Sequence, residues 1–466
     1  MKRSLYLVTL NRKQKTVLRP ANQTKRYNAC YNISNSTKGF FMNLKSIGKQ
    51  ILCVLLEGQV RRLRHHHSFK IVAVAGSVGK TSTKLAIADT LKSAYRVIYQ
   101  DGNYNDRLTV PLVLFGQTEP AIFNVLAWIK LLLANERSLR RQYPYDLAVL
   151  EIGTDGPGQL ERFAYLRPDI TVITAIEEEH MEYFKTLAAV AAEELVPLAW
   201  SAQTLLNIDD IAAQYLPDNS FVSYGFGPAD YKITGRTTAS LREQALDLKF
   251  ADGQAGTVTS PMLGEQGAKI TLAAAAVARL LAMPIDAINA AVATIKPMPG
   301  RMQLLAGIQG SWLIDDTYNS SPVAVRAALD VLYASAAPQR IAILGSMNEM
   351  GADSPAMHRR VGAYCDPAKL DLVITIGAEA AESLAPAAQE RGCRVVSFAG
   401  PRQAGGYAAT QLKEGAIVLA KGSQNGVFAE EALVPLLAKT GDRARLVRQS
   451  AAWRRHKARQ LAILEP

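Results

Sequence analysis

The sequence predicts an α/β protein in which two domains with mostly parallel sheets follow a basic leader. From residue 69 onwards, short apolar runs typical of buried strands alternate with helix-like segments, which favours parallel sheets covered by helices. Most of these runs end in a polar or glycine-containing turn, where ligands bind in such sheets. With 466 residues, 48% of them apolar, the chain can bury more than one core.

The leader, residues 1–68, carries the basic excess of the chain. Residues 1–70 hold 15 Lys and Arg against one acidic residue, Glu57, which leaves 38 basic and 40 acidic residues of the totals of 53 and 41. The body is therefore almost neutral, and the net charge of +12 does not indicate a nucleic-acid partner. It favours contact with an anionic surface such as membrane headgroups, and a solvated, partly disordered tail is the alternative.

No apolar run reaches the roughly 20 residues that a spanning helix needs. Two amphipathic stretches, 47–60 and 123–133, each precede a cluster of arginines and suit the surface of a membrane, with packing against the body as the alternative for the second. We expect a cytoplasmic protein with peripheral contact at the inner face of the membrane. Met42 is an alternative start, and a signal peptide is not indicated. Cys30, Cys53, Cys365 and Cys393 lie too far apart in the sequence to indicate a zinc site or a disulfide framework.

The strand-like runs give the order of elements in each domain. A shift to short alternating stretches at 221–261 predicts a small antiparallel insertion, and 273–281 is a strong helix. The Pro- and Gly-rich segment 296–301 marks a junction, so we place the central domain at 69–300 and the C-terminal domain at 301–466. The strand candidates are 69–75, 147–152, 170–175, 311–314, 341–344, 372–376 and 416–419.

A phosphate loop follows the first strand. Glycines at 76 and 79 leave backbone N–H groups free to face phosphates, Lys80 neutralises phosphate oxygens and the Thr81 hydroxyl is a Mg²⁺ ligand. The usual spacing would place a further glycine where this chain has Val74, and a glycine turn without nucleotide is the alternative. The predicted nucleotide-binding residues of this segment are Gly76, Ser77, Val78, Gly79, Lys80, Thr81 and Ser82.

Polar motifs follow this loop in the order typical of the Mur ligases, and the chain resembles that family over residues 69 to 440. The matching segments are Ala75 to Thr81, Gly102 to Asn105, Val110 to Leu112, Leu150 to Thr154, Thr174 to His180, Pro299 to Arg301, Asp315 to Pro322, Leu344 to Gly351, His358, and Lys421 to Ser423. Those at 315–322 and 344–351 most resemble the branch that adds D-alanyl-D-alanine to a UDP-muramoyl-tripeptide. The resemblance implies a central P-loop-type ATPase domain and a Rossmann-like C-terminal domain.

The resemblance also implies ATP and Mg²⁺ as cofactors and assigns roles to single residues. Thr81, Glu151 and His180 would hold Mg²⁺, and Asp316 would hold the ribose. Asn319 and Pro322 would border the adenine. Lys80, Arg301 and Lys421 would meet phosphate or the acyl-phosphate oxyanion. The alternatives without a catalytic or metal-binding role are a helix cap for Glu151, a surface position for His180 and a solvated linker for the triplet His65 to His67.

The chain departs from the family pattern at four places. Family members carry a carbamylated lysine fourteen positions after the residue that matches His180, where this chain has Glu194. We expect Glu194, or its neighbour Glu193, to supply the missing negative charge, with an exposed helix carboxylate as the alternative. Ala175 and Gln266 replace an asparagine and a histidine of the pattern. In front of the loop, the expected UDP-binding domain is missing, which raises the prospect of a lipid-linked muropeptide.

The predicted function is an ATP-dependent carboxylate–amine ligase of peptidoglycan precursor synthesis, which joins D-alanyl-D-alanine to a muramoyl peptide through an acyl phosphate. A carboxylate is a poor electrophile, so the protein must mainly position groups and neutralise charge while phosphate is transferred. Two alternatives stay open. One is another ligase of the same fold, acting on polyglutamate or cyanophycin-like substrates, and the other is a non-catalytic ATP-binding scaffold.

Overall fold

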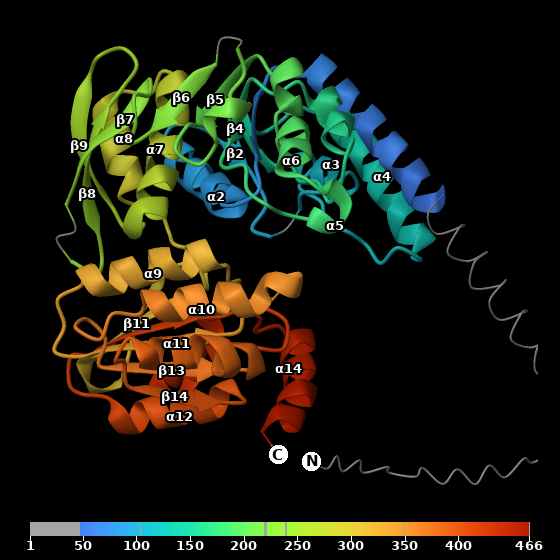
Figure 1. Ribbon diagram of the computed structural model, residues 1–466. Coiled ribbons are helices and arrows are strands. Elements are labelled where there is room, and N and C mark those ends of the chain that lie inside the picture. The colour runs from blue at the N-terminus through green and yellow to red at the C-terminus, as the bar shows by residue number, and fades with distance from the viewer. Residues whose placement is uncertain (1–46, 103, 219–220, 238–239, 349, 466) are drawn as a thin grey trace, which may run out of the picture.

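The computed structural model describes residues 47–102, 104–218, 221–237, 240–348 and 350–465. It has two sheet-containing parts, one above the other in Figure 1. The fold-class prediction is confirmed: both parts are α/β, with mostly parallel sheets and a small antiparallel portion. The suggested start at Met42, Cys30 and most of the leader lie outside the described residues, and the domain boundaries stay predictions.

The first sheet has nine strands in the order β2-β3-β1-β4-β5-β6-β7-β8-β9. Its pairs are parallel up to β7, and β7, β8 and β9 pair antiparallel. The predicted antiparallel insertion therefore extends the parallel sheet instead of forming a separate unit. The strands are β1 (Lys70–Ala75), β2 (Val97–Ile98), β3 (Leu147–Glu151), β4 (Ile170–Ile173), β5 (Gln203–Asn207), β6 (Val222–Gly225), β7 (Tyr231–Thr237), β8 (Gln244–Lys249) and β9 (Ala255–Ser260).

Two apolar cores involve residues of this sheet. One joins it to α2 (Lys80–Leu91), α7 (Gly264–Leu280) and α8 (Ile285–Val292). The alanine run 273–276 of α7 is fully buried, because small side chains let α7 approach α2 closely. The second core joins the sheet to α3 (Thr109–Leu114), α5 (Met181–Phe184) and α6 (Leu187–Glu194).

The second sheet has six strands in the order β10-β11-β15-β12-β13-β14. Only its edge pair, β10 with β11, is antiparallel. Its strands are β10 (Gln303–Ala306), β11 (Trp312–Asp316), β12 (Arg340–Gly345), β13 (Leu372–Ile376), β14 (Val395–Phe398) and β15 (Ile417–Lys421). The helices of this part are α9 (Pro322–Ala334), α10 (Ser354–Tyr364), α11 (Ala385–Glu390), α12 (Pro401–Gln411), α13 (Glu430–Leu433) and α14 (Ala451–Leu464).

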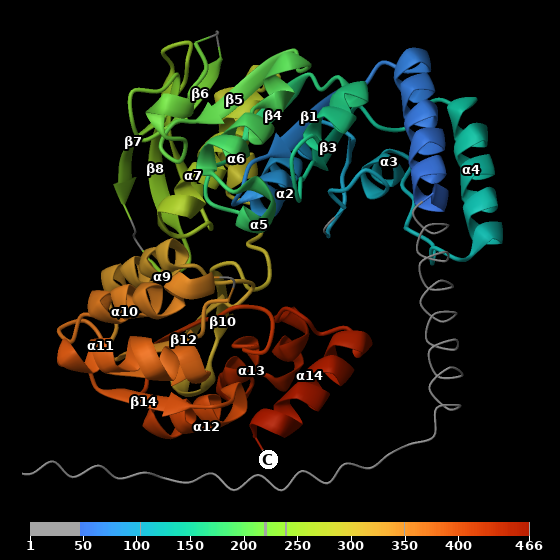
Figure 2. The same cartoon turned by 45° about the vertical axis from the view of Figure 1, so that its right-hand side comes forward.

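The end of the leader is helical over residues 47–66 and lies beside α4 (Val125–Leu139) at the outer edge of the first part (Figure 2). Leu56, Val60 and Leu63 of this helix are fully buried, so the predicted amphipathic stretch packs on the body through one face. No helix in the described part of the chain is long and apolar enough to cross a membrane.

Candidate functional site

The phosphate loop joins the end of β1 to the start of α2, as the sequence predicts. Gly76 and Gly79 have φ angles of 118° and 87°, a region that side-chain-bearing residues rarely adopt. A Cβ atom on Gly76 would lie 2.5 Å from Thr174 Oγ1. Only glycine therefore fits at the first turn of the loop.

Lys80 folds back over the loop instead of extending from it. Its ammonium donates to the carbonyl of Gly76 and to that of Ser77 at 3.2 Å, and lies 3.7 Å from a carboxylate oxygen of Glu179. The Ser77 hydroxyl donates to Glu177 O at 3.1 Å. Val78 is exposed at the loop tip and Ser82 is buried in the first turn of α2.

Glu151 ends β3 and contacts the start of α2. Its Oε1 accepts from the Thr81 hydroxyl at 3.1 Å and from Asn105 Nδ2 at 3.5 Å, while its Oε2 lies 3.3 Å from Lys84 Nζ. Burial lowers the pKa of Lys84, and the Glu151 carboxylate opposes this shift. Lys84 also donates to Gly102 O at 3.0 Å. Two of the residues predicted as metal ligands, Thr81 and Glu151, are thus in contact.

The structure separates the two adjacent carboxylates that the sequence left as alternatives. Glu193 accepts from the backbone N–H groups of residues 158, 159 and 160, each at 2.7 Å, so its carboxylate is fully used in holding that turn. Glu194 is fully buried and accepts from Gly76 N at 2.7 Å. Glu194 is therefore the carboxylate that reaches the phosphate loop.

Glu179 is a further member of this site, which the sequence motifs do not single out, although it lies within the matching segment Thr174 to His180. Burial raises the pKa of Glu194 to about 8; Lys80 opposes the shift and Glu179 adds to it. When both groups are ionised, Glu194 Oε1 and Glu179 Oε1 are buried without a hydrogen-bond donor in the described part of the chain. Without a cation, a proton on Glu194 shared with Glu179 relieves this. Buried carboxylate oxygens without donors are costly, and the cost falls if a cation sits beside them.

This donor set fits Mg²⁺, which prefers carboxylate and hydroxyl oxygens and keeps several positions for water and phosphate. The oxygens come from the Thr81 hydroxyl and from Glu151, Glu179 and Glu194. Among the described residues, no three His, Cys, Asp or Glu side chains are already arranged to hold a metal by themselves. The site suits an ion that phosphate oxygens and water complete.

His180 does not join this group. It has a φ angle of 47°, and its Nε2 lies 3.7 Å from a carboxylate oxygen of the exposed Asp155. Both line an open hollow of about 570 Å³ together with Gly156, Pro157, Gln159 and Tyr183. The role of His180 as a metal ligand stays a prediction, and its place in the structure is beside this hollow.

The predicted residues of the C-terminal part form a second group at the carboxyl ends of β11 and β15. Lys421 is buried and donates to Asp316 Oδ2 at 2.7 Å and to Asn319 O at 2.9 Å. The guanidinium of Arg301 lies 4.3 Å from the centre of the Tyr318 ring. Pro322 opens α9, whose N-terminus is capped by the Ser321 hydroxyl. The charges of Asp316 and Lys421 neutralise each other.

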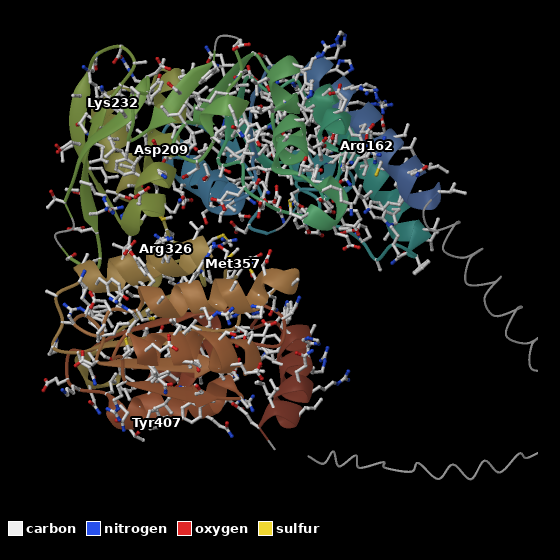
Figure 3. The ribbon with its side chains drawn as sticks, in the orientation of Figure 1. Arg162, Asp209, Lys232, Arg326, Met357 and Tyr407 are labelled. Carbon is white, nitrogen blue, oxygen red and sulfur yellow. The ribbon has the colours of Figure 1, made fainter. Side chains whose placement is uncertain are left out.

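A cavity of about 350 Å³ lies between α7 and α9, where the two sheet-containing parts meet. Figure 3 places Arg326, one of its lining residues, at this junction. Glu177 also lines the cavity and is bonded to Ser77, so the cavity adjoins the phosphate loop. Gln266, at the altered position of the family pattern, lines it as well, as does Lys269, which pairs with Asp210 at 2.8 Å.

Each of the two sheet-containing parts matches a known family domain. Residues 74–278 match the Mur ligase middle domain, and residues 300–424 match the glutamate ligase domain of Mur ligases. The chain belongs to the Mur ligase family. The recognition made from sequence motifs is therefore confirmed.

Curated relatives of this Mur ligase include UDP-N-acetylmuramoyl-tripeptide–D-alanyl-D-alanine ligases. The one from Escherichia coli is 29% identical over 320 residues, which are 66% of this chain and 64% of that protein. The one from Bacillus subtilis is 26% identical over 317 residues, 66% of this chain and 63% of the relative. This Mur ligase thus matches less than two thirds of the length of these relatives.

Solved structures share the fold. MurF from Acinetobacter baumannii has a TM-score of 0.67 and 21% identity, with 84% of this chain and 81% of that chain covered. The MurF ligase from Thermotoga maritima, solved in complex with ADP, has a TM-score of 0.64 and 23% identity, with 82% and 83% covered. Both likenesses extend across the two sheet-containing parts.

Proposed function

We propose that this Mur ligase is an ATP-dependent, ADP-forming amide ligase that adds D-alanyl-D-alanine to a muramoyl tripeptide in peptidoglycan precursor synthesis. The observation that carries the proposal is the buried carboxylate group around the phosphate loop. In this group Glu194 reaches the loop, and the Oε1 atoms of Glu179 and Glu194 have no hydrogen-bond donor among the described residues. The likeness to curated ligases with this activity supports the choice of substrates.

The reaction needs two displacements. A substrate carboxylate oxygen attacks the γ-phosphorus of ATP, the bond to ADP breaks, and an acyl phosphate forms. The amine of D-alanyl-D-alanine then attacks the acyl carbon, the C–O bond to phosphate breaks, and the nitrogen loses a proton to solvent. Lys80 moves from its own loop carbonyls to the phosphates, where its charge offsets the growing negative charge.

Thr81, Glu151 and Glu194 would hold Mg²⁺, with Glu179 beside them. The ion would screen the phosphate charges and draw electron density from the transferred group. Glu151 is held for this role by Thr81, Asn105 and Lys84. Glu194 supplies a carboxylate that needs no carbamylation, which is our interpretation of its place in the family pattern. For His180 we retain the proposed metal role, which requires it to leave Asp155.

The cavity between α7 and α9 would take the adenosine portion of ATP, because it adjoins the phosphate loop through Glu177. Asn319 and Pro322 border the start of α9 and would flank the adenine, with Asp316 on the ribose. Lys421 and Arg301 would meet the acyl phosphate. For Lys421, this requires exchange of its bond to Asp316 for one to the ligand.

Phosphate release tests the ligase reaction. Purified protein with ATP and Mg²⁺ should release phosphate only when both UDP-muramoyl-tripeptide and D-alanyl-D-alanine are present. Release with glutamate-type substrates instead would identify a different ligase of the same fold. ATP binding without turnover on any amine would overturn the ligase proposal in favour of a scaffold.

The proposed role of Glu194 predicts that the activity of the enzyme does not depend on carbon dioxide. Activity should persist in buffer stripped of carbon dioxide and bicarbonate, and Glu194→Gln should lose at least about tenfold in kcat because a neutral amide cannot supply the negative charge. Glu194→Lys should regain activity only when bicarbonate is added. Full activity of Glu194→Gln would sink the assignment.

We also propose that the protein works in the cytoplasm with peripheral contact at the inner face of the membrane. Residues 1–46 contain ten Lys and Arg and no acidic residue, a composition that favours anionic headgroups.

A further inference from the structure

An apolar surface covers the outer side of the helix at 47–66 and of α4. Along the first helix the exposed aliphatic residues are Ile47, Ile51, Val54 and Leu55, and along α4 they are Val125, Leu126, Ile129 and Leu133. Both sets recur at the three- and four-residue spacing that places side chains on one helix face. We call these eight residues the outer apolar face.

The two helices run parallel, which brings both sets to the same end of the pair. Cys53 and Leu56 share a buried cluster with Trp128 and Leu131. Further along both helices, Gln59 donates to Leu132 O at 2.9 Å and accepts from Asn135 at 2.9 Å.

A last pair joins the helices beyond that point: Arg62 donates to Glu136 at 2.9 Å. The contacts therefore advance together along both helices, and the N-terminal halves lie side by side, as Figure 2 also shows. The exposed aliphatic residues of both helices therefore lie in the same half of the pair.

The residues of this face do not form part of the hydrophobic core. Leu126 is 72% exposed, Val125 64%, Val54 59% and Ile51 56%, while the opposite sides of the same helices, at Leu56 and Trp128, are buried. Contiguous exposed apolar residues on this scale mark a surface that contacts a partner or a membrane.

The charge of the residues around the outer apolar face indicates what kind of partner it contacts. The residues that precede the face carry ten basic and no acidic side chains over positions 1–46 and join it at residue 47. Exposed Lys130 lies within the face, and the exposed arginines 61, 137, 140 and 141 follow it. An apolar helix face with basic surroundings is the pattern of helices that lie in the headgroup region of anionic bilayers.

We propose that the outer apolar face is a membrane-docking surface, in which the helix at 47–66 and α4 lie side by side in the headgroup region of an anionic bilayer. This deepens the peripheral contact in the proposed function and does not depend on the ligase chemistry. The eight aliphatic residues enter the boundary of the acyl chains, and the basic residues contact acidic headgroups.

Flotation with vesicles tests the proposal, with full-length protein and without ATP or substrates. The protein should float with phosphatidylglycerol–phosphatidylcholine vesicles and much less with phosphatidylcholine alone. Ile51→Ser with Leu126→Ser should lower the partition coefficient at least about tenfold, because both side chains lose their apolar transfer energy. The matched control is Ile463→Ser, at an isoleucine of α14 that is 80% exposed and should bind as the wild type does.

The outcomes separate the docking surface from its rivals. Unchanged melting temperatures would show that both variants fold, and unchanged turnover with soluble substrates would show that the ligase reaction is independent of docking. No flotation of the full-length chain would overturn the proposal. So would binding that the double variant retains and that about 0.5 M salt abolishes, since charge alone would then explain it. A dimer that the double variant disrupts, without vesicle binding, would assign the face to a second copy of the chain.

Discussion

Two buried groups of acidic residues, one in each sheet-containing part, differ in how their charges are matched. In the C-terminal part, Glu430 and Glu431 are almost fully buried and contact four cations. Lys457 reaches both, and Arg448 pairs with Glu430 at 2.7 Å. Glu431 also pairs with Arg443 at 3.1 Å and with Arg402 at 3.9 Å. Every carboxylate there has a cationic partner. Such a group holds α13 and α14 together.

At the phosphate loop the matching is incomplete. Of the carboxylates Glu151, Glu179 and Glu194, the first lies 3.3 Å from Lys84 and the second 3.7 Å from Lys80. Lys80 also donates to two carbonyls of its own loop. Three of their carboxylate oxygens, Glu151 Oε2, Glu179 Oε1 and Glu194 Oε1, have no hydrogen-bond donor in the described part of the chain. Of these three, Glu151 Oε2 lies beside a cation, Lys84. The difference teaches that burial of charge by itself does not identify a site; a shortage of partners, together with a loop suited to phosphate, does.

The largest expected effect comes from Lys80→Ala. Removal of the ammonium should reduce kcat for substrate-dependent phosphate release by about 10³-fold or more, because Lys80 is the cation that contacts the loop carbonyls of Gly76 and Ser77. Steady-state kinetics would measure this. Lys92→Ala, at the far end of the same helix, is the matched control and should retain activity. Full activity of Lys80→Ala would show that the charged group at the phosphate loop does not serve the reaction.

Lys457→Met tests the role of the buried pair Glu430 and Glu431, whose charges are matched by cations. It leaves both Glu430 and Glu431 short of a cation, so the free energy of unfolding should fall by about 3 kcal/mol, as measured by urea denaturation. Turnover per folded molecule should be unchanged. Arg455→Met, on an exposed position of the same helix, should be almost neutral. Equal effects of the two substitutions would show that the group does not support the fold.

Asp315 gives a pH-dependent test. Burial raises its pKa to about 6 from 3.8, and hydrogen bonds from Thr317 oppose that shift. Between about pH 4 and pH 6 the folded protein keeps a proton that the unfolded chain has lost, so wild-type stability should fall with rising pH, by about 2 kcal/mol across this window. Asp315→Asn should remove that part of the slope in urea titrations. An unchanged slope would assign it to other groups.

The smallest expected effect is that of Glu194→Gln on stability. Because the pKa of Glu194 is raised to about 8, its carboxyl is largely protonated at pH 7 without a cation, and an amide of the same shape should change the free energy of unfolding by less than about 1 kcal/mol. Glu430→Gln should cost about 2 kcal/mol by the same measurement. A larger loss for Glu194→Gln would show that this carboxylate serves the fold.

The phosphate loop and the strand ends were predictable from the sequence, because glycines, an apolar strand and the following helix are adjacent in the chain. Glu151 and Glu194 could be selected through their spacing within a family pattern. Glu193 and Glu194 could not be separated in this way, since only the 100° turn between successive helical residues sends one toward residues 158–160 and the other toward Gly76.

Other features depend on contacts between distant parts of the chain. The pairing of Glu179 with Lys80 depends on the path of the loop after β4, and the parallel pairing of α4 with the helix at 47–66 joins segments more than 70 residues apart. Strands β2, β5, β10 and β14 were missed because their runs are short or partly polar. The antiparallel strands β7 to β9 fall within the insertion predicted at 221–261, but β6, in the same range, pairs parallel with β5 and with β7. Local patterns do not encode these parallel pairings.

The folded-back position of Lys80 makes anion binding an exchange reaction. Any incoming anion competes with the carbonyls of Gly76 and Ser77, so its apparent affinity reflects only the surplus over those internal bonds. A weakly charged anion gains little from the exchange, whereas a polyphosphate gains from the lysine and from the N–H groups of the loop at once. Selectivity for highly charged ligands is thus a property of the resting loop, set before any ligand arrives.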